Sequence, residues 1–242
     1  MTGRTLPSPP RAILLDVGGT LLAEQSHDLL AGARTFLEGS DLPGRPSSPE
    51  ELESWLSDLE SVVEATRILD DREFSLSDWL RSHLPVSPAD VAVAELAIWV
   101  SGVVLTPVEG AREALERIHA HGIPVAVLSN TCFSGRTLEF ELRRQGFGVP
   151  FEFVMTSADC GRRKPDAQPF LRALSHFQTP ADQAWYVGDS WEADVVGAAG
   201  VGMTAVWLAP TGSASDATRH HRAASWKEAT GLLEAALGGT ER

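Results

Sequence analysis

Short apolar runs alternate with helical segments along most of this chain, and this alternation constrains the fold more than any other feature. The first run, residues 12–15, ends at Asp16 and two glycines. A run this short and this apolar is typical of a strand buried on both faces. Similar runs cover residues 124–128, 151–155, 185–187 and 204–208, and helical patterns between them cover 109–121, 135–145, 166–177 and 192–199. We therefore predict an α/β fold, a doubly wound parallel sheet with a Rossmann-like core.

The segment from residue 23 to residue 105 interrupts the alternation. It contains no convincing strand, and its helical patterns cover residues 28–38, 50–69, 75–83 and 88–101. Pro107 marks the return to the core, because a proline cannot continue a helix. We predict an α/β core domain of residues 1–22 and 106–242, with an all-helical cap domain of residues 23–105 inserted after the first strand.

Charge and composition exclude several kinds of partner. The formal net charge is -13 and the sequence pI is about 4.9, so neither nucleic acid nor an anionic membrane surface is an expected partner. No apolar stretch reaches the roughly 20 residues of a membrane helix, and no signal peptide is visible. We expect a cytoplasmic protein in which the two cysteines, Cys132 and Cys160, stay reduced.

Polar side chains stand at four of the predicted strand ends. They are Asp16, Ser129, Asn130, Lys164, Asp189 and Asp194. Ligands of doubly wound sheets bind beyond the carboxyl ends of the strands, so we expect these groups to meet. Two carboxylates brought together, such as Asp16 and Asp189, repel one another unless a cation lies between them.

Such a cluster suits phosphoryl transfer. A magnesium ion favours oxygen ligands and keeps waters that a phosphate can replace. The Lys164 ammonium and a hydroxyl of Ser129 or Thr20 would hold phosphoryl oxygens. Asp16 could then attack phosphorus and form an aspartyl-phosphate that water later hydrolyses.

These residues resemble the four motifs of the haloacid dehalogenase-like hydrolases, in the family's order. Residues 16–21 (Asp-Val-Gly-Gly-Thr-Leu) resemble the first motif, and Ser129 the second. Lys164-Pro165-Asp166 resembles the third motif, and residues 188–194 the fourth. The insert between the first two motifs matches the position of the family's helical, C1-type cap.

The resemblance implies a phosphatase that needs Mg²⁺ and acts on a small phosphorylated metabolite. It implies catalytic roles for Asp16, the nucleophile, and for Lys164. The implied phosphate-binding residues are Thr20, Ser129, Asn130 and Lys164. The implied metal ligands are Asp16, the backbone carbonyl of Gly18, Asp189 and Asp194.

Gly18 makes the first motif atypical. Phosphatases of the family usually carry an aspartate at this position, which protonates the leaving oxygen and then activates water. Three explanations stay open. The leaving group is a good one, such as an acyl or aryl phosphate; Glu24 or His27 supplies the proton; or the protein is catalytically impaired and serves as a scaffold that binds a ligand or a protein partner.

The sequence disfavours three related chemistries. Phosphonate cleavage needs a cap lysine for a Schiff base, and residues 23–105 contain no lysine. Haloacid dehalogenation needs no magnesium and could dispense with a carboxylate at position 189, but this chain keeps Asp189. A phospho-accepting receiver domain is compact and carries no insert of this size.

Several other side chains are expected to have ordinary roles. We expect Trp55, Trp79 and Trp99 to pack inside the cap. We expect His220 and His221 to be solvated.

Overall fold

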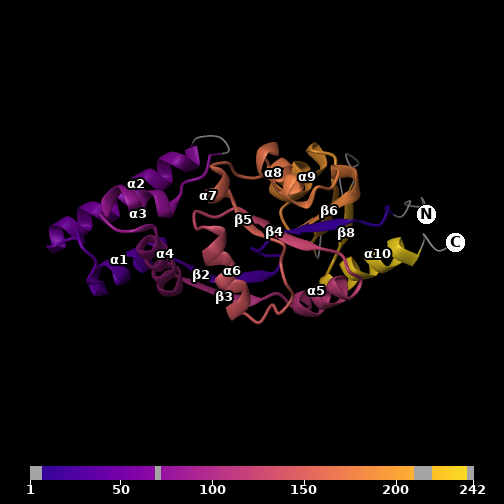
Figure 1. The fold of residues 1–242 in the computed structure, drawn as a ribbon, viewed down its shortest axis with the longest axis horizontal. Coiled ribbons are helices and arrows are strands. Elements are labelled where there is room, and N and C mark those ends of the chain that lie inside the picture. Colours follow the sequence, from indigo (N-terminus) through magenta and orange to yellow (C-terminus); the bar gives the residue numbers. More distant parts are fainter. Residues whose placement is uncertain (1–6, 69–71, 210–219, 239–242) are drawn as a thin grey trace.

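The computed structural model describes residues 7–68, 72–209 and 220–238. A parallel sheet with helices on both faces forms one part of the molecule (Figure 1). Four helices of residues 29–102, here called the helical lobe, form the other part at the left of that view. Among the described residues, no helix combines the length and the apolar character needed to cross a membrane.

Six parallel strands form the main sheet in the order β5-β4-β1-β6-β7-β8. The strands are β1 (Ala12–Leu15), β4 (Val125–Ser129), β5 (Val154–Thr156), β6 (Ala184–Gly188), β7 (Thr204–Leu208) and β8 (His220–Ala223). After β1 the chain builds β4 and β5 on one side of that strand. It then crosses to the other side and builds β6, β7 and β8, so the strand order reverses at β1. The predicted doubly wound parallel sheet is confirmed.

Alternate residues of β1 contribute to two hydrophobic layers. Ile13 and Leu15 belong to one core cluster, and Leu14 belongs to the other. Helices α5 (Ala111–Ala120), α6 (Gly135–Arg144) and α10 (Trp226–Gly238) share the first cluster, and α8 (Ala167–Phe177) and α9 (Gly197–Gly200) share the second. Both faces of the sheet are therefore covered, which explains the uninterrupted apolar run of β1.

Three short helical elements complete the core. They are α7 (Ser157–Cys160), the 3₁₀-helix η1 (Ala181–Gln183) and the π-helix η2 (Trp191–Val196). The π-helix overlaps the range predicted as an ordinary helix, residues 192–199. Such elements are rare and often lie at functional sites.

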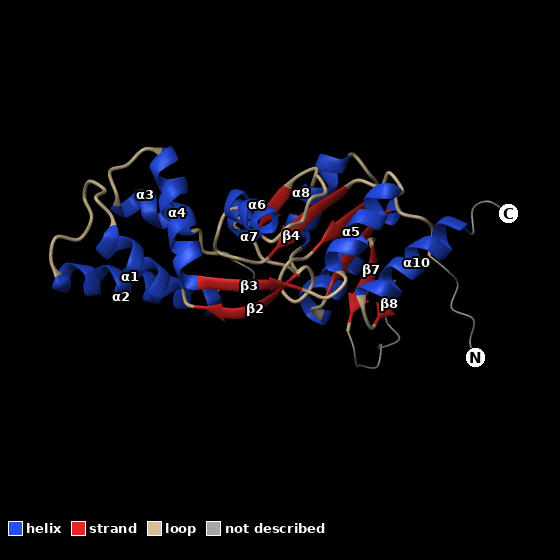
Figure 2. Ribbon diagram, turned by 90° about the horizontal axis from the view of Figure 1, so that it is seen from below, coloured by secondary structure: helices blue, strands red, loops and turns tan. Residues whose placement is uncertain are grey.

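An antiparallel ribbon of two strands joins the sheet to the helical lobe (Figure 2). It consists of β2 (Leu22–His27) and β3 (Val103–Pro107), in which Leu22 faces Pro107 and His27 faces Val103. The prediction that residues 23–105 contain no strand is therefore wrong at both ends of that segment. Most of β2 is exposed and has no apolar alternation, so only its pairing with the distant β3 makes it a strand.

The helical lobe consists of α1 (Leu29–Gly39), α2 (Pro49–Ile68), α3 (Leu76–His83) and α4 (Pro88–Gly102). Helices α1 and α4 approach closely at two glycines. A Cβ on Gly32 would overlap the backbone of α4 at Ile98, and a Cβ on Gly102 would overlap the carbonyl of Asp28, which caps α1. Trp79 is buried and packs against the half-buried Trp55 inside the lobe, as expected. Trp99 is also buried, but its ring contacts Phe133 and its Nε1 donates to Glu141, so it packs against the core as well. The predicted domain boundaries fall inside the ribbon, and the division of the chain into two domains stays a prediction.

The edge strand β8 also differs from expectation. His220 begins this strand and is only 5% exposed, so the prediction that it is solvated is wrong. His221 pairs with Val206 of β7 and is half-buried. A strand that begins with two histidines and an arginine has no apolar pattern to mark it.

Candidate active site

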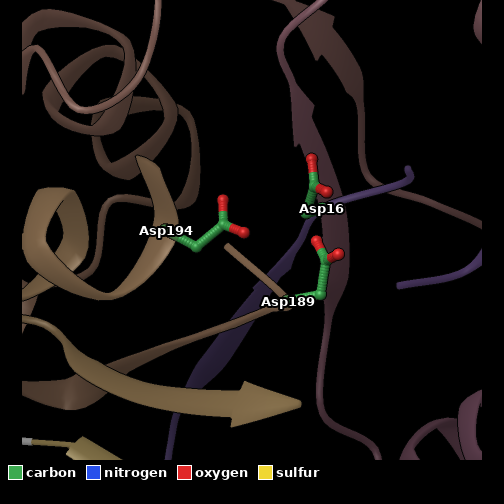
Figure 3. Close-up of side chains that lie close together, drawn as sticks. All are labelled: Asp16, Asp189 and Asp194. Atoms are coloured by element: carbon green, nitrogen blue, oxygen red, sulfur yellow. The ribbon is translucent and has the colours of Figure 1, made fainter. Parts of the chain in front are cut away.

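Three carboxylates meet at the carboxyl end of the main sheet. Asp16 follows β1, Asp189 follows β6, and Asp194 lies on η2. The pairing of Leu15 with Val187 places the ends of β1 and β6 side by side. One carboxylate oxygen of each aspartate lies within 4.8 Å of the others, and Figure 3 shows the three side chains grouped together.

Two glycines allow the carboxylates to approach so closely. A Cβ on Gly188 would overlap the carboxylate of Asp194, and a Cβ on Gly19 would overlap that of Asp189. Gly19 also has a φ of 70°, which favours glycine. The packing of the acids therefore requires Gly19 of the first motif and Gly188 of the fourth.

The first turn of η2 fixes Asp194. The Ser190 hydroxyl accepts a hydrogen bond from the Ala193 N–H at 3.2 Å, and the Ser190 N–H donates to Asp194 Oδ2 at 2.9 Å. The remaining carboxylate oxygen of Asp194 faces Lys164. Asp194 is 1% exposed, so it is held inside the protein by these bonds.

Lys164 lies at the centre of the cluster. Its Nζ donates to Asp16 Oδ1 at 2.7 Å, to Asp194 Oδ1 at 2.7 Å and to the Tyr186 hydroxyl at 2.6 Å. The Tyr186 hydroxyl in turn donates to the carbonyl of Leu128 at 2.8 Å. Lys164 is 4% exposed, so all three of its ammonium protons are used inside the protein.

Burial and mutual repulsion shift the pKa values of the cluster. Burial raises the pKa of Asp16 from 3.8 to about 6; the Lys164 charge opposes this rise and the Asp194 charge adds to it. Burial and the Asp194 charge also raise the pKa of Asp189. Burial alone would lower the pKa of Lys164, but the carboxylates of Asp16 and Asp194 raise it above its ordinary value. Three carboxylates face one ammonium, an excess of negative charge that a divalent cation would neutralise.

The loops after β4 and before α8 are joined by Asn130. Its side-chain oxygen accepts from the Lys164 N–H at 2.8 Å, and its side-chain nitrogen donates to the Lys164 carbonyl at 2.9 Å. The side-chain oxygen and one proton of the side-chain nitrogen are therefore engaged in joining the two loops. Ser129 ends β4 beside it and is 6% exposed.

The Thr20 hydroxyl interacts with the Asp189 carboxylate but lacks a well-formed hydrogen bond. The residue is fully buried, and among the described residues its Oγ1 makes no hydrogen bond of normal geometry. Its carbonyl accepts from Trp226 Nε1 at 2.7 Å, which holds the turn after β1 in place. A buried hydroxyl without a well-formed hydrogen bond is costly, and a ligand oxygen bound at the carboxylates would remove that cost.

Gly18 leaves open space beside Asp16. The residue is exposed, and a Cβ built on it would meet nothing within 4 Å. The two residues considered as substitutes for the missing acid, Glu24 and His27, form a pair with Oε2 and Nδ1 3.2 Å apart. The position of the missing acid therefore has room for a side chain, and no described neighbour fills it.

A cavity of about 460 Å³ lies between the helical lobe and the core. Asn130 and Thr131, which follow Ser129, belong to its wall, so the cavity adjoins the carboxylate cluster. Its acidic wall residues are Glu24, Asp28, Glu60, Glu64 and Glu73, and its basic ones are His27, Arg72 and Arg163. Acidic residues therefore outnumber basic residues in this wall.

The sequence predicted all the acids of this site but none of the aromatic residues that support them. Tyr186 binds Lys164, Trp226 binds the Thr20 carbonyl, and Trp207 Nε1 donates to the Asp189 carbonyl at 2.8 Å. The one available signal was Tyr186, the only residue with a hydroxyl in the otherwise apolar strand β6. The two tryptophans lie on β7 and α10, and no local sequence pattern marks them as part of the site.

Comparison with known proteins finds a family likeness in part of the chain. Residues 98–208 match the family described as haloacid dehalogenase-like hydrolase. This part of the chain is similar to the haloacid dehalogenase-like hydrolases. The matched residues include the second, third and fourth motifs, and the first motif lies next to them in space.

Two curated relatives show the same likeness. A ribulose-1,5-bisphosphate 5-phosphatase from Halopiger xanaduensis is 31% identical over 144 residues, which are 59% of this chain and 59% of the relative. A phosphoglycolate phosphatase from Nitrosospira multiformis is 28% identical over 186 residues, 76% of this chain and 77% of the relative. The match to the first relative thus spans less than two thirds of its length.

Solved structures share the haloacid dehalogenase-like fold. A phosphatase of the family from Thermococcus onnurineus superposes with a TM-score of 0.55 at 21% identity, over 92% of this chain and 97% of that one. At this identity the likeness concerns the fold alone.

Proposed function

We propose that this protein is a magnesium-dependent phosphatase that hydrolyses a small phosphorylated metabolite through an aspartyl-phosphate at Asp16. One observation carries the proposal: a buried lysine bonded to two of three converging carboxylates, beside a buried hydroxyl that lacks a well-formed hydrogen bond. The names of the two curated relatives, both phosphatases, support the same activity.

The residues present fit a magnesium ion. Asp16, Asp189 and Asp194 offer only oxygen ligands, which this ion prefers, and the Gly18 carbonyl would complete the protein's share. The ion would supply positive charge to a phosphoryl oxygen and to the attacking carboxylate. The net negative charge of the cluster supports this assignment.

The side chains around the cluster would carry out the transfer. An oxygen of Asp16 forms a bond to phosphorus while the bond from phosphorus to the leaving oxygen breaks. The Lys164 ammonium and the hydroxyls of Ser129 and Thr20 bind the transferring phosphoryl group, with the backbone N–H of Asn130. Water then attacks phosphorus, releases inorganic phosphate and restores the Asp16 carboxylate.

The absence of an acid at Gly18 limits both steps. No side chain at this position protonates the leaving oxygen, so we propose that good leaving groups, such as acyl or aryl phosphates, are favoured. No side chain there activates water, so the second step would be the slower one. Hydrolysis of an aryl phosphate would then begin with a burst of released phenol.

The cavity would hold the leaving group, and its charge bears on which group that is. Glu60 and Glu64 stand one turn apart on α2 and have no ion pair among the described residues, whereas Arg163 is already paired with Glu73. A leaving group with a negative charge would meet this acidic wall at a cost. We propose that neutral or cationic leaving groups are preferred.

Turnover of p-nitrophenyl phosphate with and without Mg²⁺ tests the proposal. Asp16→Asn should abolish a magnesium-dependent activity. Glu192→Gln, which changes an exposed acid on the π-helix that carries Asp194, should leave the activity nearly unchanged. Magnesium binding without any turnover would favour the second candidate, a catalytically impaired scaffold that binds a ligand or a protein partner. The open space at Gly18 is the observation that keeps this candidate in view.

A further inference from the structure

A segment of the helical lobe lies directly on the core loops that carry the candidate site. Arg72 pairs with Arg162 in an antiparallel bridge. The Glu73 N–H donates to the Gly161 carbonyl at 3.3 Å, and the Leu76 N–H donates to the Cys132 carbonyl at 3.0 Å. The segment therefore contacts both the loop after β4 and the loop before α8.

The carboxylate of Glu73 is the acidic group at this contact. Its side chain is 4% exposed, so it is buried between the lobe and the core. Oε2 accepts from Arg163 Nη1 at 2.9 Å and from the Ser157 hydroxyl at 2.6 Å. A single oxygen thus binds two core residues that are six positions apart in the sequence.

Each of these two residues leads to a residue of the candidate site. The Ser157 hydroxyl accepts from the Thr131 N–H at 2.8 Å, and Thr131 is the second residue after Ser129. Arg163 immediately precedes Lys164, the lysine of the carboxylate cluster. The Glu73 carboxylate therefore bridges the loop of Ser129 and the loop of Lys164 from outside the core.

We propose that Glu73 is a positioning residue, a carboxylate of the helical lobe that fixes the Ser129 and Lys164 loops at the spacing phosphate binding requires. The proposal rests on the phosphatase function proposed above. Docking of the lobe and assembly of the phosphate site are then one event, because the same carboxylate makes both sets of contacts. Groups that act by position lose much of their effect when displaced by about 1 Å, at a cost on the order of 100-fold in rate.

A second buried acid of the lobe provides a matched control. Glu95 on α4 is fully buried and accepts from the Ser134 N–H, from the Ser77 hydroxyl and, at 3.1 Å, from the Thr137 hydroxyl. It joins the lobe to α6 and does not contact the Lys164 loop. Glu73 and Glu95 therefore share burial, lobe–core contact and a link to the loop after β4, but only Glu73 also reaches the Lys164 loop.

The test compares Glu73→Gln, Glu73→Asp and Glu95→Gln in the full chain, with p-nitrophenyl phosphate and Mg²⁺. We expect Glu73→Gln to lower kcat by about 10- to 100-fold with little change in KM, because the phosphoryl group is held less well in the transition state. Glu73→Asp should recover part of this loss. Glu95→Gln should lower the thermal midpoint at least as much as Glu73→Gln but should leave kcat within about threefold. Equal losses of kcat in the two glutamine variants would overturn the proposal.

Hydrogen exchange gives a readout that does not depend on activity. Glu73→Gln should speed exchange in peptides that cover residues 129–134 and 157–164, and Glu95→Gln should speed it in α4 and α6 without affecting residues 157–164. Unchanged exchange in both loops of Glu73→Gln would also overturn the proposal. If the wild-type protein lacks turnover, the proposed function fails, while exchange still decides whether Glu73 holds the two loops.

Discussion

Restoring an acid at position 18 should convert this protein into a faster phosphatase. Gly18 is exposed, its φ is not positive, and a Cβ there would meet nothing within 4 Å. Gly18→Asp should therefore fold normally, with a change in the free energy of unfolding of no more than about 0.5 kcal/mol. Gly19 offers the contrast, because a Cβ there would overlap Asp189.

The expected gain depends on the leaving group. General acid–base catalysis by one positioned side chain contributes about 10²- to 10⁴-fold. Alkyl phosphates, whose leaving oxygen needs a proton, should gain at the upper end of that range in kcat/KM. p-Nitrophenyl phosphate needs little protonation and should gain mainly in the second step, so its initial burst should shrink while steady-state turnover rises.

The assay compares wild type, Gly18→Asp and Gly18→Asn on both substrates at saturating Mg²⁺. Gly18→Asn has the same shape as the aspartate but cannot transfer a proton, so it should remain at the wild-type rate. An equal gain from asparagine, or no gain from aspartate on the alkyl phosphate, would refute the reasoning that the site lacks only this acid.

Three further predictions concern other parts of the site. Burial raises the pKa of the Cys132 thiol from 9.0 to about 12, so at pH 8 the folded protein should alkylate at this residue about 1000-fold more slowly than in urea, as followed by mass spectrometry. Tyr186→Phe removes one acceptor from the buried Lys164, and urea denaturation should show a loss of about 1–3 kcal/mol; no loss would mean that the hydroxyl is not needed there. Wild type should have a higher kcat/KM for phosphoethanolamine than for phosphoglycolate, because the acidic wall favours a cationic leaving group. The combined variant Glu60→Gln/Glu64→Gln should reduce the ratio of these two kcat/KM values several-fold, and an unchanged ratio would argue against an effect of the acidic wall.

The sequence predicted the parts of this fold that have local patterns. The strands around Asp16, Ser129 and Asp189 are short apolar runs, and the carboxyl ends of neighbouring parallel strands necessarily meet. The convergence of these side chains with Lys164 and Asp194 could therefore be predicted from order and spacing alone. The catalytic roles assigned to them stay predictions.

The remaining features depend on contacts between distant residues. The β2–β3 ribbon pairs segments that are separated by the whole helical lobe, and its exposed first strand has no apolar alternation. The Trp226 bond to the Thr20 carbonyl joins residues 206 positions apart. Glu73 resembles any other acid of the lobe until its contact with Arg163 is known. No periodicity marks such contacts, because they arise from tertiary packing.

The most direct test of the proposed chemistry is to detect the aspartyl-phosphate. Wild-type protein would be mixed with p-nitrophenyl phosphate and Mg²⁺, quenched in acid within the first turnovers and analysed by peptide mass spectrometry. The account predicts a phosphoryl group on the peptide that contains Asp16, present only with Mg²⁺ and absent in Asp16→Asn. Turnover without phosphorylation of that peptide, or an Asp16→Asn variant that keeps the wild-type rate, would contradict it.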